Sequence, residues 1–193
     1  MNLTKRQIEI LEASLDIIDQ GGIQSLTIKN ISKKVGISEP AIYRHFDSKT
    51  EILLTILDYF IVNNNQIIRK DLMQNEDIKQ VLTKLFDNFT QTFLDYPALI
   101  SIIFSEEIFR NDPVFREKSN RILNGNFEMI IKLIEKGQTA GQIQKDLNTA
   151  SLATIIMGSL RLCVKRWQMS DYSFDLQKHS KQLRDTILKI ILK

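Results

Sequence analysis

The sequence predicts an all-α protein, with a three-helix head that contains a helix-turn-helix and a six-helix domain after it. Apolar residues recur at intervals of three and four along most of the 193 residues, which is helical spacing. We find no alternating strand pattern and no internal repeat of about 20–50 residues. The 7 Gly and 3 Pro supply few turns, which favours long helices.

The first helix is predicted to begin after Thr4 and to end at Gly21-Gly22. Thr4 and Gln7 have the spacing of a capping box, in which each side chain bonds the backbone of the other residue. Glycine after the last apolar position is a common helix end. One face of this helix carries Ile8, Leu11, Leu15 and Ile18.

Two further helices meet at a tight turn within residues 27–49. Thr27 is placed to cap the first of them, and Ser38 to cap the second. Between them, Gly36 can adopt the left-handed backbone that ends a helix. Pro40 suits the first turn of the second helix. Two helices joined in this way form a helix-turn-helix, whose second helix can enter a DNA major groove.

The second helix of this pair has an apolar and a polar side. Ile42 and Phe46 are four residues apart and are expected to face inward. Ideal helix geometry turns the following residues outward or to the flanks: Pro40, Ala41, Tyr43, Arg44 and His45. Arginine can pair with guanine, a methyl group can contact thymine, and a phenol can reach a phosphate. The alternatives are an ordinary surface hairpin and, for His45, a structural imidazole.

Lys49 opens the next predicted helix, which runs to about Met73. Ser48 and Glu51 form a second capping box in front of it. A lysine in the first turn opposes the helix dipole. Its position is favourable if a phosphate binds there, because a helix N-terminus attracts anions.

Five more helices are predicted after this one. Pro97 is expected to start a helix through about Phe109, and Asp112-Pro113 to cap and start another that ends at Gly137 or Gly141. Asn148 or Thr149 is expected to cap the penultimate helix. The remaining apolar stripes lie within residues 82–93, 123–134, 149–168 and 175–192.

Composition and motifs narrow the class of protein. The single Cys163 excludes an internal disulfide, and the sequence has neither a signal peptide pattern nor an apolar run long enough for a membrane span, so we expect a cytoplasmic protein. The two histidines, His45 and His179, have no partner at metal-binding spacing. A nucleophile elbow and a Gly-rich phosphate loop are also lacking, so we expect no enzyme, metal or cofactor.

The stretch GISEPAIYRHFDSKTEIL, Gly36–Leu53, resembles the DNA-binding signature of the TetR/AcrR family of bacterial transcriptional regulators. The resemblance covers about residues 5–60. It implies a DNA-binding domain at 1–48 and an effector-binding and dimerisation domain at 49–193. It also implies a homodimer that forms through about 149–168 and 175–192.

The resemblance also implies roles for individual residues. It assigns phosphate contacts to Thr27, Tyr43, His45 and Lys49, and base-edge contacts to Glu39, Pro40, Ala41 and Arg44, with Ser38 beside them. The sequence departs from the family's commonest pattern at Glu39-Pro40. A carboxylate there can accept from a cytosine amine but repels phosphate, so the bases that are read stay open.

The expected function is a repressor that a small, largely apolar effector releases from a palindromic operator. Aromatic residues that can line the effector pocket, or simply fill the core, are Phe60, Phe86, Phe89, Phe93, Phe104 and Trp167. One alternative keeps the head but makes the protein a DNA-bound scaffold or nucleoid-associated factor without an effector. Another is a helical enzyme or ligand carrier with a vestigial head.

Overall fold

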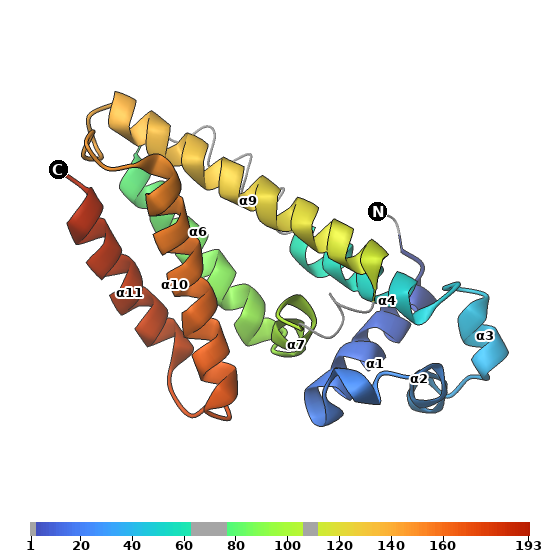
Figure 1. Ribbon diagram of the computed structural model, residues 1–193. Coiled ribbons are helices and arrows are strands. Elements are labelled where there is room, and N and C mark those ends of the chain that lie inside the picture. The colour runs from blue at the N-terminus through green and yellow to red at the C-terminus, as the bar shows by residue number, and fades with distance from the viewer. Residues whose placement is uncertain (1–2, 63–76, 106–111) are drawn as a thin grey trace. The chain divides into compact units, whose positions relative to one another are not determined.

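The computed structural model describes residues 3–62, 77–105 and 112–193 (Figure 1). These residues form nine α-helices, one short 3₁₀ helix and one π-helical segment, without a β-strand among them. The predicted all-α fold is therefore confirmed. The chain divides into two compact units. Unit 1 lies within residues 1–64 and 96–119, and unit 2 within residues 65–95 and 120–193.

Unit 1 begins with α1 (Lys5–Gly21), η1 (Ile23–Ser25), α2 (Ile28–Val35) and α3 (Glu39–Tyr43). Thr4 and Gln7 form the predicted capping box at the start of α1. Gly22 follows the last residue of α1 with a φ of 71°, in agreement with the predicted glycine end. α1 packs against α2, and α2 packs against α3 (Figure 1).

The turn of the helix-turn-helix agrees with the prediction except at Ser38. Thr27 caps α2 by accepting from the Asn30 N–H, and Gly36 ends α2 in the left-handed conformation with φ 76°. Ser38 is the N-cap residue of α3, as predicted, but its side chain makes no capping hydrogen bond. An N-cap side chain bonds the second or third N–H of its helix. Here the second is Pro40, which has none, and the third, Ala41 N–H, donates to the Ser38 carbonyl at 2.9 Å.

α4 (Lys49–Ile56) starts one residue after the capping Ser48, whose hydroxyl accepts from the Glu51 N–H at 3.1 Å. The second capping box is only half formed, because the Glu51 carboxylate accepts from the Asp47 N–H instead of the Ser48 N–H. α4 passes directly into the π-helical η2 (Leu57–Val62). The rest of the helix predicted to reach Met73 lies outside the described residues.

α7 (Ala98–Ile103) and the first turns of α9 (Pro113–Thr139) complete unit 1. Pro97 is the N-cap of α7, one position earlier than predicted, and α7 ends at Ile103 instead of near Phe109. α9 begins at Pro113 as predicted. Asp112 caps it by accepting from the Phe115 N–H at 3.0 Å.

Unit 2 consists of α6 (Ile78–Asp95), residues 120–139 of α9, α10 (Thr149–Met169) and α11 (Leu176–Ile191). α6 packs against both α10 and α11, which also pack against each other (Figure 1). Asn148, one of the two predicted candidates, caps α10 by accepting from the Ser151 N–H. Gly137 lies inside α9, whereas Gly141 follows its end with φ 73°.

The core of unit 2 is apolar, with a few paired polar groups. Its buried side chains include Phe86, Ile134 and Ile156. The Thr90 and Ser180 hydroxyls bond each other at 2.5 Å between α6 and α11, and Arg184, 8% exposed, donates to Asp87 at 2.8 Å. These bonds fix the register of α6 on α11, because a buried polar group left without a partner is costly. No helix in the described ranges is both long and apolar enough to cross a membrane.

Candidate nucleic-acid interface

The recognition segment is shorter than predicted. α3 has five residues, so Arg44 and His45 lie in the turn after the helix and not on it. The His45 and Phe46 N–H groups both donate to the Ile42 carbonyl, which continues the last helical turn loosely. Ile42 and Phe46 are 0% and 2% exposed, so their predicted inward placement is confirmed.

The outward surface of this segment contains most of the predicted residues, but not Ala41. Glu39, Pro40 and Arg44 are exposed, as is Ser38, and Tyr43 is 51% exposed. Ala41 is 8% exposed, so its predicted outward placement is wrong. The prediction used the geometry of a long regular helix. In a five-residue helix that packs against α2, both Ala41 and Ile42 turn inward.

Two helix N-termini lie next to this surface in the chain. Thr27 is exposed at the start of α2, and because its oxygen already accepts from Asn30, its O–H remains as a donor. Lys49 is half-buried in the first position of α4. The first N–H groups of a helix attract anions, so both termini suit a phosphate backbone.

A residue that the sequence analysis treated only as a cap also belongs here. The Gln7 Nε2 group donates to the His45 carbonyl at 3.3 Å, which joins the start of α1 to the turn after α3. The sequence signal was present in the capping box, but no pattern shows that a capping side chain also reaches a residue 38 positions away.

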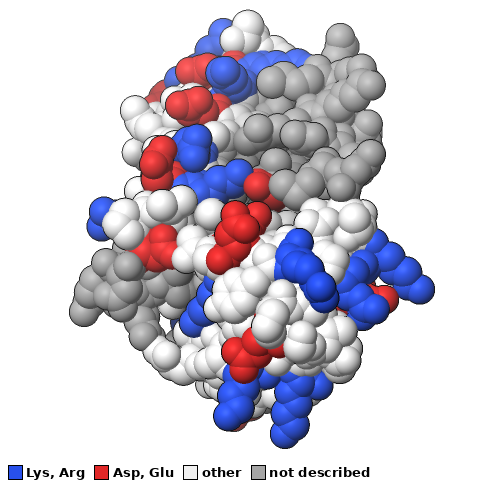
Figure 2. Space-filling view, turned by 90° about the vertical axis from the view of Figure 1, so that its right-hand side faces the viewer, with Lys and Arg blue, Asp and Glu red and all other residues white. Residues whose placement is uncertain are grey.

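Some cations of the head are already paired. Lys34 bonds Asp16 at 3.0 Å, and Arg6 bonds Glu9 at 2.7 Å. Figure 2 looks toward the side that carries α3, and its lower part shows Lys and Arg side chains around a largely uncharged area with single acids among them. A mild positive rim of this kind attracts phosphate, while sequence must be read by the side chains within it.

The six aromatic residues predicted for an effector pocket belong to different units. Phe60 and Phe104 are in unit 1, and Phe86, Phe89, Phe93 and Trp167 are in unit 2. The ring centroids of Phe60 and Tyr96 are 4.4 Å apart, and those of Phe89 and Phe93 are 4.9 Å apart. Phe60, Phe86, Phe93 and Trp167 are at most 7% exposed, so they contribute to the apolar cores of their units.

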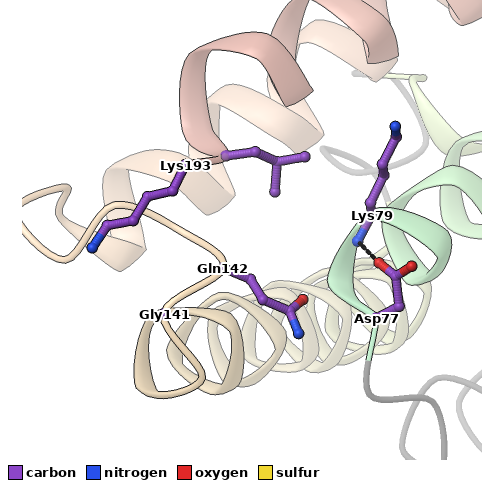
Figure 3. Close-up of a pocket in the computed structure, with 6 residues that line it drawn as sticks. Asp77, Lys79, Gly141, Gln142 and Lys193 are labelled. Atoms are coloured by element: carbon purple, nitrogen blue, oxygen red, sulfur yellow. Dashed lines mark hydrogen bonds between the residues drawn. The ribbon is translucent and has the colours of Figure 1, made fainter.

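Unit 2 also has an open surface pocket, lined by charged, polar and apolar residues, that the sequence did not predict (Figure 3). It is lined by Asp77, Lys79, Gly141, Gln142, Leu192 and Lys193, and contains none of the six aromatic residues. Asp77 accepts from the Lys79 N–H at 2.9 Å, and the Gln142 Oε1 atom accepts from the Ile78 N–H at 2.8 Å. The first turn of α6 is thus already capped by two oxygen atoms from the chain itself.

The sequence predicts no metal site, because His45 and His179 lack a partner at metal-binding spacing. His179 packs on Phe174, with ring centroids 4.5 Å apart, and its Nδ1 lies 2.9 Å from the Asp175 carbonyl. Within residues 3–62, 77–105 and 112–193, no three His, Cys, Asp or Glu residues are grouped so that they could hold a metal ion.

This geometry defines a helix-turn-helix DNA-binding protein with a separate helical unit, which is the architecture of a transcriptional regulator. Comparison with known families agrees. The profile of the bacterial regulatory proteins of the tetR family matches residues 10–56, and that of the YsiA-like protein C-terminal region matches residues 57–190. The chain belongs to the TetR family of DNA-binding transcriptional regulators.

Individual relatives are distant but cover most of the chain. The fatty acid metabolism regulator protein of Bacillus subtilis (strain 168) is 23% identical over 175 residues, which is 89% of this chain and 88% of that protein. The fatty acid degradation regulator FadR of Bacillus halodurans is 21% identical and covers 97% of both chains, with a TM-score of 0.82. FadR of B. subtilis in complex with stearoyl-CoA is 22% identical and covers 94% of this chain and 97% of its own, with a TM-score of 0.77.

Proposed function

We propose that this regulator is a homodimeric repressor, released from a roughly palindromic operator by an acyl-chain effector. The DNA-binding part rests on the exposure of Glu39, Tyr43 and Arg44 on one short segment. The buried side chains of Ile42 and Phe46 anchor this segment from the other side. Anchored apolar residues hold the segment in place, and the exposed polar groups face outward, as base reading requires.

The roles of the head residues divide by chemistry. We assign base edges to Arg44 as a guanine reader and to Glu39 as an acceptor from an amino group, with Pro40 as their apolar neighbour. Phosphate contacts are assigned to Thr27, Ser38, Tyr43, His45 and Lys49. Ala41 is left out because it is buried.

Each function is assigned to one continuous part of the chain. We place DNA binding in residues 1–48, and effector binding and dimerisation in residues 49–193. α10 and α11 provide the dimer surface, because Ile155, Leu162 and Ile190 are 54–60% exposed there. Exposed apolar side chains on neighbouring helices favour association. We assign the chain no catalytic step, and we infer a cytoplasmic location from the proposed binding to DNA.

The acyl-chain effector is inferred from the relatives and from the aromatic residues. One relative is named a fatty acid metabolism regulator, and a similar structure holds stearoyl-CoA. Phe86, Phe93 and Trp167 offer an apolar environment that an acyl chain can enter if their packing opens. An effector that binds the DNA-incompetent conformation better than the competent one shifts the population away from DNA.

The test starts with selection of duplex sites from a random-sequence pool by the wild-type protein. Stearoyl-CoA is then titrated against the strongest selected duplex, with coenzyme A alone and stearate as controls. We expect stearoyl-CoA to weaken operator binding by about 5- to 150-fold. The duplex should weaken stearoyl-CoA binding by the same factor, because linkage is reciprocal.

The possible outcomes separate the parts of the proposal. Failure to select any duplex contradicts the DNA-binding assignment. Selection without any response to stearoyl-CoA, stearate or coenzyme A contradicts the acyl effector and favours the scaffold alternative. A response to coenzyme A alone would show that the nucleotide portion, and not the apolar chain, is recognised.

A further inference from the structure

The side chain of Gln7 makes two kinds of contact at once. Its Oε1 atom accepts from the Thr4 N–H at 3.0 Å and from the Thr4 hydroxyl at 3.2 Å. Its Nε2 atom donates to the His45 carbonyl at 3.3 Å. One carboxamide therefore closes the cap of α1 and connects α1 to the turn after α3.

The second contact, from Gln7 Nε2 to the His45 carbonyl, is made in the turn that follows the short helix α3. α3 has only five residues, and the turn after it carries Arg44, with Lys49 opening α4 shortly beyond. A helix this short has few internal hydrogen bonds, so tertiary contacts must fix its direction. Ile42 and Phe46 fix it from below, and Gln7 fixes the backbone between the two DNA-facing groups.

A glutamine at position 7 suits the contact with His45 better than it suits the capping of α1. Glu and Gln both complete a capping box, and a Glu in the first turn also gains from the helix dipole. Only Gln has an N–H group to donate, because an ionised Glu side chain has acceptors alone. At this position a Glu would turn its second oxygen toward the His45 carbonyl, and two acceptors repel each other.

We propose that Gln7 is a positioning residue for operator recognition. By holding the His45 carbonyl, it sets the orientation of the turn that presents Arg44 to base edges and leads to Lys49. Gln7 itself contacts neither bases nor phosphates in this role. The inference rests on the proposed DNA-binding role of the exposed recognition segment.

The test compares three variants of the full-length chain. Gln7→Glu keeps the capping box and removes the donor to His45. Lys5→Gln is matched to it in charge, because each substitution lowers the net charge by one unit in the first turn of α1. Thr4→Ala weakens the cap but leaves the Gln7 donor in place.

The readout is the ratio of the dissociation constants for random duplex and for the strongest duplex that the wild type selects from a random pool. We expect Gln7→Glu to lower this ratio by about fivefold, as for one neutral hydrogen bond, with an unfolding temperature close to that of the wild type. Lys5→Gln should weaken both duplexes equally and leave the ratio unchanged. Thr4→Ala should lower the unfolding temperature while keeping the ratio.

Three results would overturn the inference: an unchanged ratio in Gln7→Glu, a ratio that falls as far in Lys5→Gln, or a Gln7→Glu unfolding temperature below that of Thr4→Ala. The last result would attribute any loss to stability. Failure of the wild type to select any duplex would instead contradict the proposed function, so the two failures are distinguishable.

Discussion

At the scale of single residues, Arg44 and Lys49 should have different effects on DNA binding. Arg44 is exposed just beyond α3, where its guanidinium can bond guanine in two places. We expect Arg44→Ala to cost about 1–3 kcal/mol of discrimination between the selected site and the same site with its guanine replaced. Competition binding on the two duplexes measures this. An equal loss on selected and random DNA would contradict base reading.

Lys49 opens α4, and its ammonium group is assigned to phosphate. We expect Lys49→Ala to weaken binding to all sequences by a similar factor and to reduce the slope of log K against log salt by about one. Titrations at several salt concentrations provide the slope. If the slope stays the same while discrimination falls, Lys49 reads sequence and the assignment is wrong.

The residues that the sequence predicted correctly are those whose role depends on local chemistry. Thr27, Gly36 and Asn148 occupy the predicted cap and turn positions, because each role depends on neighbours within four residues. Ser38 occupies its predicted cap position without a side-chain bond, and the outward placement predicted for Ala41 is wrong, for a related reason. Pro40 removes the N–H that Ser38 would have bonded, and α3 is too short for ideal helix geometry to place Ala41.

At the scale of helices, Asp112 caps the 27-residue α9 and also ties it to α4. Its carboxylate accepts from the Phe115 N–H and from the Thr50 hydroxyl. Burial raises the pKa of Asp112, but hydrogen bonds from Thr50 and from the Phe115 and Val114 N–H groups outweigh it. The net pKa lies below the usual value of 3.8.

A lowered folded-state pKa means that this carboxylate stabilises the fold above the unfolded-state pKa, and that the contribution is lost as pH falls through the folded-state value. We expect Asp112→Ala to cost about 1 kcal/mol at neutral pH, as for loss of a helix cap. Its deficit in unfolding temperature relative to the wild type should shrink as pH falls below about 4. A deficit that is the same at pH 7 and at pH 3 would show that the charged form contributes nothing.

Helix boundaries could be predicted only where caps define them. Asp112-Pro113 marks the start of α9 in the sequence, and the structure agrees. No residue marks the change from α4 to the π-helical η2, since the apolar spacing of Leu53, Ile56 and Phe60 fits either form. The ion pair between Lys118 and Asp58, at 2.6 Å, joins positions 60 residues apart, which no local pattern can indicate.

At the scale of the whole molecule, neither compact unit is one continuous segment of the chain. Unit 1 combines the head with residues 96–119, because α7 packs against α1 and the start of α9 is bonded to α4 and η2. The division at residue 48 that the resemblance implies is continuous in sequence, and it stays a prediction about function. Sequence patterns detect continuous segments, whereas a compact unit is defined by contacts between distant ones.

The dimer that the proposed function requires can be tested on the outer face of α10. Ile155 and Leu162 are seven residues apart, on one side of the helix, and are 54% and 60% exposed. A carboxylate buried in an apolar interface without a partner is costly, so we expect Leu162→Glu to convert a dimer into monomers in sedimentation at micromolar concentration. Operator binding should weaken sharply, because two linked heads spaced about 34–36 Å apart would no longer bind together.

The matched control is Leu123→Glu on α9, where Leu123 is 46% exposed and lies outside both proposed interface helices. Dissociation by Leu123→Glu, or a Leu162→Glu protein that remains dimeric, would place the interface elsewhere.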